Sequence, residues 1–203
     1  MSIKKGITGV LVLFLILFIS FSLFKKKEGK YISPPELIVC FGDSLTSGEG
    51  AGIGEDYPSR LEKILGIKTV NAGVPGDTTS SALLRLEKDV LVWEPDLVII
   101  LLGGNDFLQR KSMEETVRNI KTIIRILKER DIEVLLISPV AYYDQEFKKI
   151  SKIFNTLFLP HIMRKILLNP ELKSDEVHPN SRGYQVMAEI IAKKLKKHIH
   201  SPR

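Results

Sequence analysis

Five short apolar runs, most of them without alternating polar residues, constrain the fold of this chain more than any other feature. They span Leu37–Phe41, Lys68–Asn71, Leu97–Leu102, Val134–Ile137 and Thr156–Leu159. Strands that are apolar throughout are typical of a parallel sheet that is buried on both faces. Helical patterns separate the runs, so the sequence predicts an α/β protein: a three-layer α/β/α sandwich around a mostly parallel five-stranded sheet.

Two helices are predicted most clearly. The first runs from Ser112 to about Arg130, with apolar residues at spacings of three and four, and Ser112 and Glu115 form a capping-box signature at its start. The last helix begins near Asn180 or Ser181. Its buried stripe is expected at Tyr184, Met187, Ile191 and Leu195.

The N-terminus carries a segment of a different kind. Residues 7–24 form an uncharged run rich in Leu, Ile, Val and Phe, with lysines on both sides. As a helix this run would be about 27 Å long, close to the roughly 30 Å hydrocarbon core of a bilayer. We therefore expect residues 1–24 to be a membrane anchor, or a signal segment if they are cleaved. Residues 25–35 would be a tether, and residues 36–203 the folded domain.

The N-terminal segment also gives an expectation for the side of the membrane on which the folded domain lies. The lysines are too evenly divided between the two flanks for the positive-inside rule to give an orientation. We expect a membrane-anchored catalytic domain outside the cytoplasm, periplasmic or at the cell surface, because export signals occupy the same position. It would be secreted if the segment is cleaved.

Charge and cysteine content exclude several classes of function. The formal net charge is +6, but the first thirty residues hold six Lys and one Glu, so the remainder carries only +1. We therefore expect no nucleic-acid partner. The single cysteine, Cys40, lies in an apolar run and is expected to be a buried thiol, and no CxxC or HExxH pattern indicates a metal. We expect no metal or organic cofactor, and a monomer.

Glycine-containing turns follow the first three apolar runs. They read Gly42-Asp43-Ser44, then Gly73-Val74-Pro75-Gly76-Asp77-Thr78, then Gly103-Gly104-Asn105-Asp106. The carboxyl ends of parallel strands meet at one sheet edge, so these turns should come together there. A histidine near the other end of the chain, in Asp175-Glu176-Val177-His178-Pro179, could deprotonate a serine at that edge.

These four blocks, in this order, resemble the signature of the SGNH/GDSL hydrolase family, and most of all its bacterial thioesterase I/lysophospholipase L1/arylesterase branch. The resemblance covers residues 36–195 and implies a flavodoxin-like fold. It implies that Ser44 is the nucleophile and that His178 is the general base, oriented by Asp175. The Ser44 and Gly76 backbone N–H groups and the Asn105 side chain would form the oxyanion hole.

The resemblance implies less about the substrate than about the catalytic residues. The segment around residues 142–154 is shorter than in this branch, where it helps to shape the acyl pocket, so chain-length preference cannot be transferred. Residues expected in the pocket wall, with ordinary packing as the alternative, are Phe107, Leu108, Tyr142 and Tyr143. His161 is a rival base outside any family block.

The sequence thus predicts a serine hydrolase of carboxylic (acyl) esters that works through an acyl-enzyme. A lysophospholipase, arylesterase or thioesterase is favoured, with a small acyl ester or a lysophospholipid as substrate and the membrane as partner. The alternatives are a carbohydrate O-acetyl esterase and a membrane-tethered binding module without turnover.

Overall fold

The computed structural model describes residues 32–199, and its centre is a five-stranded sheet in which every pair of neighbouring strands is parallel. The strand order is β2-β1-β3-β4-β5. Each of the five predicted runs forms one strand. The strands are β1 (Leu37–Gly42), β2 (Lys68–Gly73), β3 (Leu97–Leu101), β4 (Glu133–Ile137) and β5 (Leu157–Leu159).

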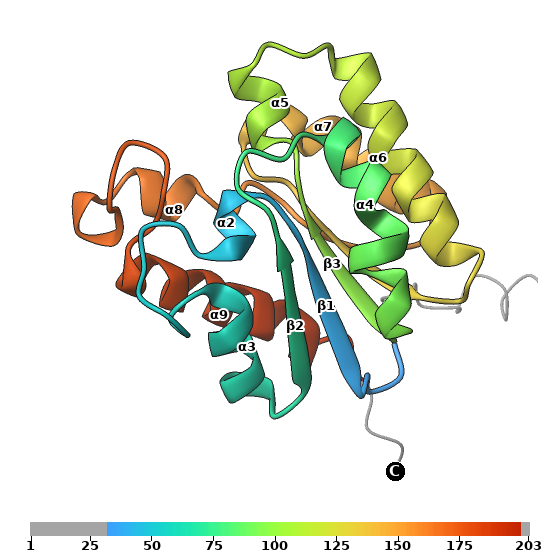
Figure 1. Ribbon diagram of the computed structural model, residues 1–203, viewed down its shortest axis with the longest axis horizontal. Coiled ribbons are helices and arrows are strands. Elements are labelled where there is room, and N and C mark those ends of the chain that lie inside the picture. The colour runs from blue at the N-terminus through green and yellow to red at the C-terminus, as the bar shows by residue number, and fades with distance from the viewer. Residues whose placement is uncertain (1–31, 200–203) are drawn as a thin grey trace, which may run out of the picture. The chain divides into compact units, whose positions relative to one another are not determined.

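The apolar runs are continuous because helices cover both faces of the sheet, as Figure 1 shows. Along β1, Ile38 and Cys40 pack into the core on one face, and Val39 and Phe41 pack into the core on the other. All four are fully buried. The predicted three-layer α/β/α sandwich is therefore confirmed. The edge strand β2 is more exposed than the others.

The helices divide between the two faces. Helices α3 (Tyr57–Leu65) and α9 (Ser181–Lys196) contact each other on the first face, and α4 (Thr79–Asp89), α6 (Met113–Lys128) and α7 (Asp144–Ile153) lie on the second. Short helical segments connect these elements. They are α2 (Ser44–Ser47), η1 (Leu91–Trp93), α5 (Gly104–Leu108), η2 (Ala141–Tyr143), α8 (Arg164–Leu167) and η3 (Pro170–Leu172).

Both predicted helix starts are found where the sequence places them. Ser112 caps α6 by accepting a hydrogen bond from the Glu115 N–H, at 3.1 Å. The Glu115 carboxylate does not complete a capping box, because it accepts a hydrogen bond from Ser80 instead. This tertiary contact with α4 has thus replaced one local contact of the predicted capping box. Asn180 caps α9, and the predicted apolar stripe of α9 is fully buried.

Two glycines let the turn after β1 pack tightly. A Cβ at Gly42 would lie 2.1 Å from Thr46 Oγ1 and 2.5 Å from the Leu101 carbonyl oxygen. A Cβ at Gly73 would lie 2.2 Å from the Ser47 backbone nitrogen. Both distances are far below van der Waals contact, so only glycine allows α2 to lie against the ends of β2 and β3.

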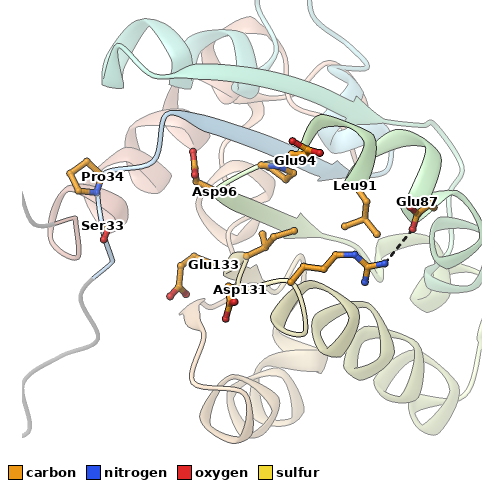
Figure 2. A pocket seen from close by; sticks show the side chains of 11 residues that line it. Ser33, Pro34, Glu87, Leu91, Glu94, Asp96, Asp131 and Glu133 are labelled. Atoms are coloured by element: carbon orange, nitrogen blue, oxygen red, sulfur yellow. Dashed lines mark ion pairs between the residues drawn. The ribbon is translucent and has the colours of Figure 1, made fainter.

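A cavity of about 710 Å³ lies at the amino edge of the sheet (Figure 2). Its lining includes Pro34 before β1, Asp96 before β3 and Glu133 at the start of β4. Arg130 and Glu87 form an ion pair across it at 3.7 Å. This cavity is at the opposite end of the strands from the predicted catalytic turns.

The predicted anchor or signal segment at residues 1–24 and most of the tether lie outside the described residues. Within residues 32–199 no helix has both the length and the apolar character needed to cross a membrane.

Candidate active site

The carboxyl end of β1 presents Ser44 at the first residue of α2. Asp43 caps this helix, because its side chain accepts the Leu45 N–H at 3.0 Å and its carbonyl oxygen accepts the N–H groups of Thr46 and Ser47. The strand therefore ends in a tight turn that brings the Ser44 hydroxyl to the sheet edge.

The Ser44 hydroxyl meets a histidine that is 134 residues away in the sequence. His178 Nε2 lies 3.0 Å from Ser44 Oγ, and His178 Nδ1 lies 2.7 Å from Asp175 Oδ2. If Nδ1 carries the proton donated to Asp175, Nε2 is free to accept the Ser44 proton. The geometry is that of a Ser–His–Asp triad.

Asp175 also fixes the turn that carries His178. Its Oδ1 accepts the N–H groups of Val177 and His178, at 2.8 and 2.7 Å. The hydrogen bond from the His178 ring, followed by these two backbone bonds, lowers the pKa of Asp175 to about 2. The carboxylate is therefore ionised over the whole neutral range, although its side chain is half exposed.

The two other predicted oxyanion donors come from the turns after β2 and β3. Asn105 lies in α5 and lines the catalytic pocket, and its Nδ2 donates to the Asp77 carbonyl oxygen at 2.9 Å. Gly76 sits in the loop before Asp77 with φ at +81°, exposed and outside the lining of the pocket. Val74 N–H donates to the Gly42 carbonyl at 3.0 Å, which fastens this loop to β1.

Arg85, on α4, connects the ends of β1 and β2 to the loop that carries Gly76. Its guanidinium donates to the carbonyl oxygens of Gly42 and Ala72 at 2.9 and 3.0 Å, and to Asp77 Oδ2 at 2.5 Å. It also lies 4.6 Å from the centre of the Phe41 ring. The ends of β1 and β2 and the Gly76 loop are therefore fixed by a single side chain.

A second polar network positions Asn105 through its neighbour. Asp106 is fully buried and accepts hydrogen bonds from the Thr79 N–H at 2.8 Å and from the hydroxyl groups of Thr79 and Thr116 at 2.5 and 3.2 Å. Because these donors belong to α4 and α6, Asp106 ties α5 to both helices.

A pocket of about 250 Å³ opens beside Ser44 and His178. Its apolar lining comes from several elements: Leu45, Phe107, Leu108, Pro139, Val140, Met163, Leu167 and Val177. Phe107 and Leu108 thus lie where the sequence analysis expects them. Tyr142 is outside the lining and packs against Phe107, with ring centres 5.3 Å apart. Tyr143 is fully buried, stacks on Phe147 and also lies outside the lining.

Asp43 is a buried carboxyl group in this pocket. Burial raises its pKa to about 7; the neighbouring Asp77 also raises it, while the Leu45 N–H and His178 lower it. The sequence pattern assigns this residue no separate role. Its position directly before the nucleophile in the Gly-Asp-Ser block was the available signal.

His161 is held elsewhere. Its Nδ1 contacts Asp144 Oδ2, its backbone N–H donates to Asp144 Oδ1 at 3.0 Å, and it lines a different cavity. The lining of the catalytic pocket does not include it. Among residues 32–199 no group of three or more His, Cys, Asp and Glu side chains is placed to hold a metal ion.

Other residues at the site carried no sequence signal. Arg85 is the clearest case, because one arginine in a helical pattern does not reveal that its guanidinium reaches two strand ends. Met163 and Leu167 enter the pocket from the segment after β5, a contact that depends on the tertiary fold. Glu176 lies inside the Asp-x-x-His block, where the pattern fixes only the first and last residues.

The fold and this Ser–His–Asp arrangement define the class: an α/β serine hydrolase with its site at the carboxyl edge of the sheet. Comparison with known proteins is consistent with this class. The model of the GDSL-like Lipase/Acylhydrolase family matches residues 40–186. Thioesterase 1/protease 1/lysophospholipase L1 of Escherichia coli K12 is 30% identical over 173 residues, which cover 79% of this chain and 83% of that protein.

Two further relatives match nearly their whole length. The acetylxylan esterase of Geobacillus stearothermophilus is 24% identical, over 81% of this chain and 95% of that protein. The structure of a lipolytic protein of the G-D-S-L family from Desulfitobacterium hafniense DCB-2 superposes with a TM-score of 0.68 at 25% identity, over 79% of this chain and 99% of that one.

The chain belongs to the GDSL-like lipase/acylhydrolase family, as the four sequence blocks indicated. It is an enzyme that hydrolyses ester bonds, and the alternative of a binding module without turnover is set aside.

Proposed function

We propose that this protein hydrolyses carboxylic esters of short to medium acyl chains through an acyl-enzyme on Ser44. The observation that carries the proposal is the hydrogen-bond chain from Ser44 Oγ to His178 Nε2, at 3.0 Å, and from His178 Nδ1 to Asp175, at 2.7 Å. Asp175 orients the ring and stabilises the imidazolium that forms when His178 takes a proton.

Ser44 and His178 carry out the bond-making and proton-transfer steps. His178 Nε2 takes the Ser44 proton while Oγ forms a bond to the carbonyl carbon, and the negative charge develops on the carbonyl oxygen. The N–H groups of Ser44 and Gly76 and the Asn105 amide are the proposed donors to that oxygen. The tetrahedral adduct breaks its C–O bond, and His178 returns the proton to the leaving alcohol. Water repeats the two steps, which releases the acid and restores Ser44.

The lining of the pocket supports the acyl-ester assignment. Eight of the residues around it are apolar, and its volume of about 250 Å³ suits a short or medium acyl chain. A lysophospholipid or a thioester of similar chain length is compatible with this pocket. Carbohydrate O-acetyl esters are the second candidate, because one relative is an acetylxylan esterase. An open polar cleft would favour that candidate, and the apolar lining counts against it.

The test is hydrolysis of p-nitrophenyl esters from acetate to palmitate by the full-length chain and by Ser44→Ala. We expect an optimum between butyrate and decanoate, loss of turnover in the variant, and labelling of Ser44 by a fluorophosphonate only in the wild type. An acetate optimum combined with faster release of acetate from acetylated xylan would move the assignment to carbohydrate esters. Turnover that persists in Ser44→Ala would contradict the mechanism.

We also propose that residues 1–24 anchor the enzyme in a membrane with the catalytic domain outside the cytoplasm, or direct its secretion if they are cleaved. The apolar run between lysines in the sequence supports this proposal. Protease treatment of intact cells or spheroplasts tests the orientation: an exported domain is degraded, whereas a cytoplasmic one is protected.

A further inference from the structure

The catalytic pocket has an uneven charge distribution. None of its lining residues is Lys or Arg, whereas Asp43, Glu176 and His178 are among them. Asp43 is buried and accepts the Leu45 N–H, and His178 is paired with Asp175. Glu176 is exposed, and within residues 32–199 its carboxylate has no hydrogen bond or ion pair. The pocket therefore presents one unpaired negative charge beside an apolar lining.

The proposed mechanism determines which part of the substrate this charge meets. His178 must reach the leaving oxygen to return its proton, so the alcohol part of the ester lies on the His178 side of Ser44. Glu176 precedes His178 by two residues in the turn that Asp175 fixes through the N–H groups of Val177 and His178. The acyl part then lies toward the apolar residues of α5 and α8, such as Phe107 and Leu167.

We propose that Glu176 binds a cationic group on the leaving alcohol, so that this enzyme prefers esters of alkylammonium alcohols, of the choline or ethanolamine kind, over neutral esters of the same shape. The inference rests on the function proposed above, since it assumes that His178 protonates the leaving group. Val177, which is 40% exposed and also lines the pocket, offers an apolar contact for the methyl or methylene groups around the nitrogen.

The expected size of the effect is modest because Glu176 is exposed. Ion pairs in contact with water stabilise a complex only weakly, and salt screens them. We therefore expect a preference of roughly threefold to fivefold in kcat/KM, expressed mainly in KM, that declines at high ionic strength.

The experiment compares two esters that differ in a single atom and its charge: butyrylcholine and 3,3-dimethylbutyl butyrate, in which carbon replaces the quaternary nitrogen. The full-length chain should hydrolyse the choline ester with the higher kcat/KM at low salt. Glu176→Gln should bring the ratio of the two values to about one, and Glu176→Lys should reverse it. The ratio cancels any general effect of these substitutions on the catalytic turn.

The matched control is Glu171→Gln, which removes the same charge from an exposed residue outside the pocket lining and should leave the ratio unchanged. Equal kcat/KM values in the wild type, or a preference that survives in Glu176→Gln, would overturn the inference. If Ser44 hydrolyses both esters equally, the inference fails and the proposed function stands. If neither ester is hydrolysed although p-nitrophenyl butyrate is, the inference fails and the proposed function stands, whereas both fail if p-nitrophenyl butyrate is not hydrolysed either.

Discussion

At the scale of single residues, the catalytic apparatus is a set of local turns that become functional only when they meet. Asp43 and Asp175 each accept N–H groups from the residues that follow them, which shapes the turns before Ser44 and before His178. Each turn is stable because of its own short-range hydrogen bonds. The contact between Ser44 and His178 then needs only the correct packing of the elements that carry the turns.

Asn105 should contribute to the rate more than to binding. Asn105→Ala removes a donor to the developing oxyanion, and we expect kcat to fall by roughly a hundredfold, about 3 kcal/mol, with little change in KM. Steady-state kinetics on p-nitrophenyl butyrate measure both values. Gln109→Ala, which removes an exposed amide at the end of the same helix, is the control. An equal loss in both variants would refute a specific role for Asn105.

Asp43 should make stability depend on pH. Its pKa of about 7 in the folded protein exceeds the ordinary value of 3.8, so between about pH 4 and 7 unfolding releases a proton and the free energy of unfolding falls as pH rises. The fall is up to about 4 kcal/mol. Asp43→Asn should remove it, as measured by urea unfolding at pH 4.5 and 8.

The control for this prediction is Asp131→Asn, which changes an exposed carboxylate and should leave the pH dependence of stability as it is. Asp175 acts with the opposite sign and below this interval, because its pKa is lowered to about 2. A pH dependence in Asp43→Asn as steep as in the wild type would contradict the prediction.

The sequence identified at this scale the residues whose role follows from a short pattern. Ser44, Asp175 and His178 lie together as predicted, and Asn105 lines the same pocket. Gly76 is exposed and lies outside the lining of the pocket, and Tyr143 is buried in the core. The difference is physical, since an aromatic residue near a predicted site can face either the pocket or the core, and only the packing decides between them.

At the scale of secondary-structure elements, α4 determines the shape of the catalytic edge. Arg85 reaches from this helix to the Gly42 and Ala72 carbonyl oxygens and to Asp77, so it connects the helix to two strand ends and to the Gly76 loop. No apolar pattern predicts this contact, because the helical stripe shows only which residues face the sheet. The element boundaries, by contrast, followed closely from apolar runs and caps.

Removing Arg85 should destabilise the fold and loosen the Gly76 loop, which carries one of the proposed oxyanion donors. Arg85→Met leaves Asp77, which is only 7% exposed, without its cation, and we expect a loss of about 3 kcal/mol in urea unfolding. Arg85→Met combined with Asp77→Asn should recover part of this loss, because the uncompensated charge is gone. Arg125→Met, in an exposed pair with Glu129, is the control and should change stability by less than about 1 kcal/mol.

At the scale of the whole molecule, two cavities lie at opposite edges of the sheet. The carboxyl edge carries the pocket beside Ser44. The amino edge carries the larger cavity near Pro34, close to where the described residues begin (Figure 2). The order of strands and helices predicted this polarity, because a parallel sheet collects its turns at one edge. Cavity volumes could not be predicted, since they depend on how side chains from distant elements fill the space.

Deleting residues 1–30 should separate location from catalysis. Ser44, Asp175 and His178 all lie in the part of the chain that the deletion retains. The deletion also leaves in place the hydrogen bond from the Ile32 N–H to the His198 carbonyl oxygen, at 2.8 Å. We expect kcat/KM for p-nitrophenyl butyrate to stay within about twofold. The proposal that residues 1–24 anchor the enzyme further predicts that the intact chain sediments with membranes and that the deletion variant does not. Loss of activity in this variant would mean that the segment supports the fold.

Cys40 gives the molecule a property useful for spectroscopy. It is the chain's only cysteine, it is fully buried in β1, and burial raises the pKa of its thiol, so the reactive thiolate is suppressed. A maleimide dye should therefore leave the native protein unlabelled. A cysteine introduced on the surface, for example Leu168→Cys next to the pocket-lining Leu167, would then carry the only dye and could report on substrate binding without removal of the natural thiol.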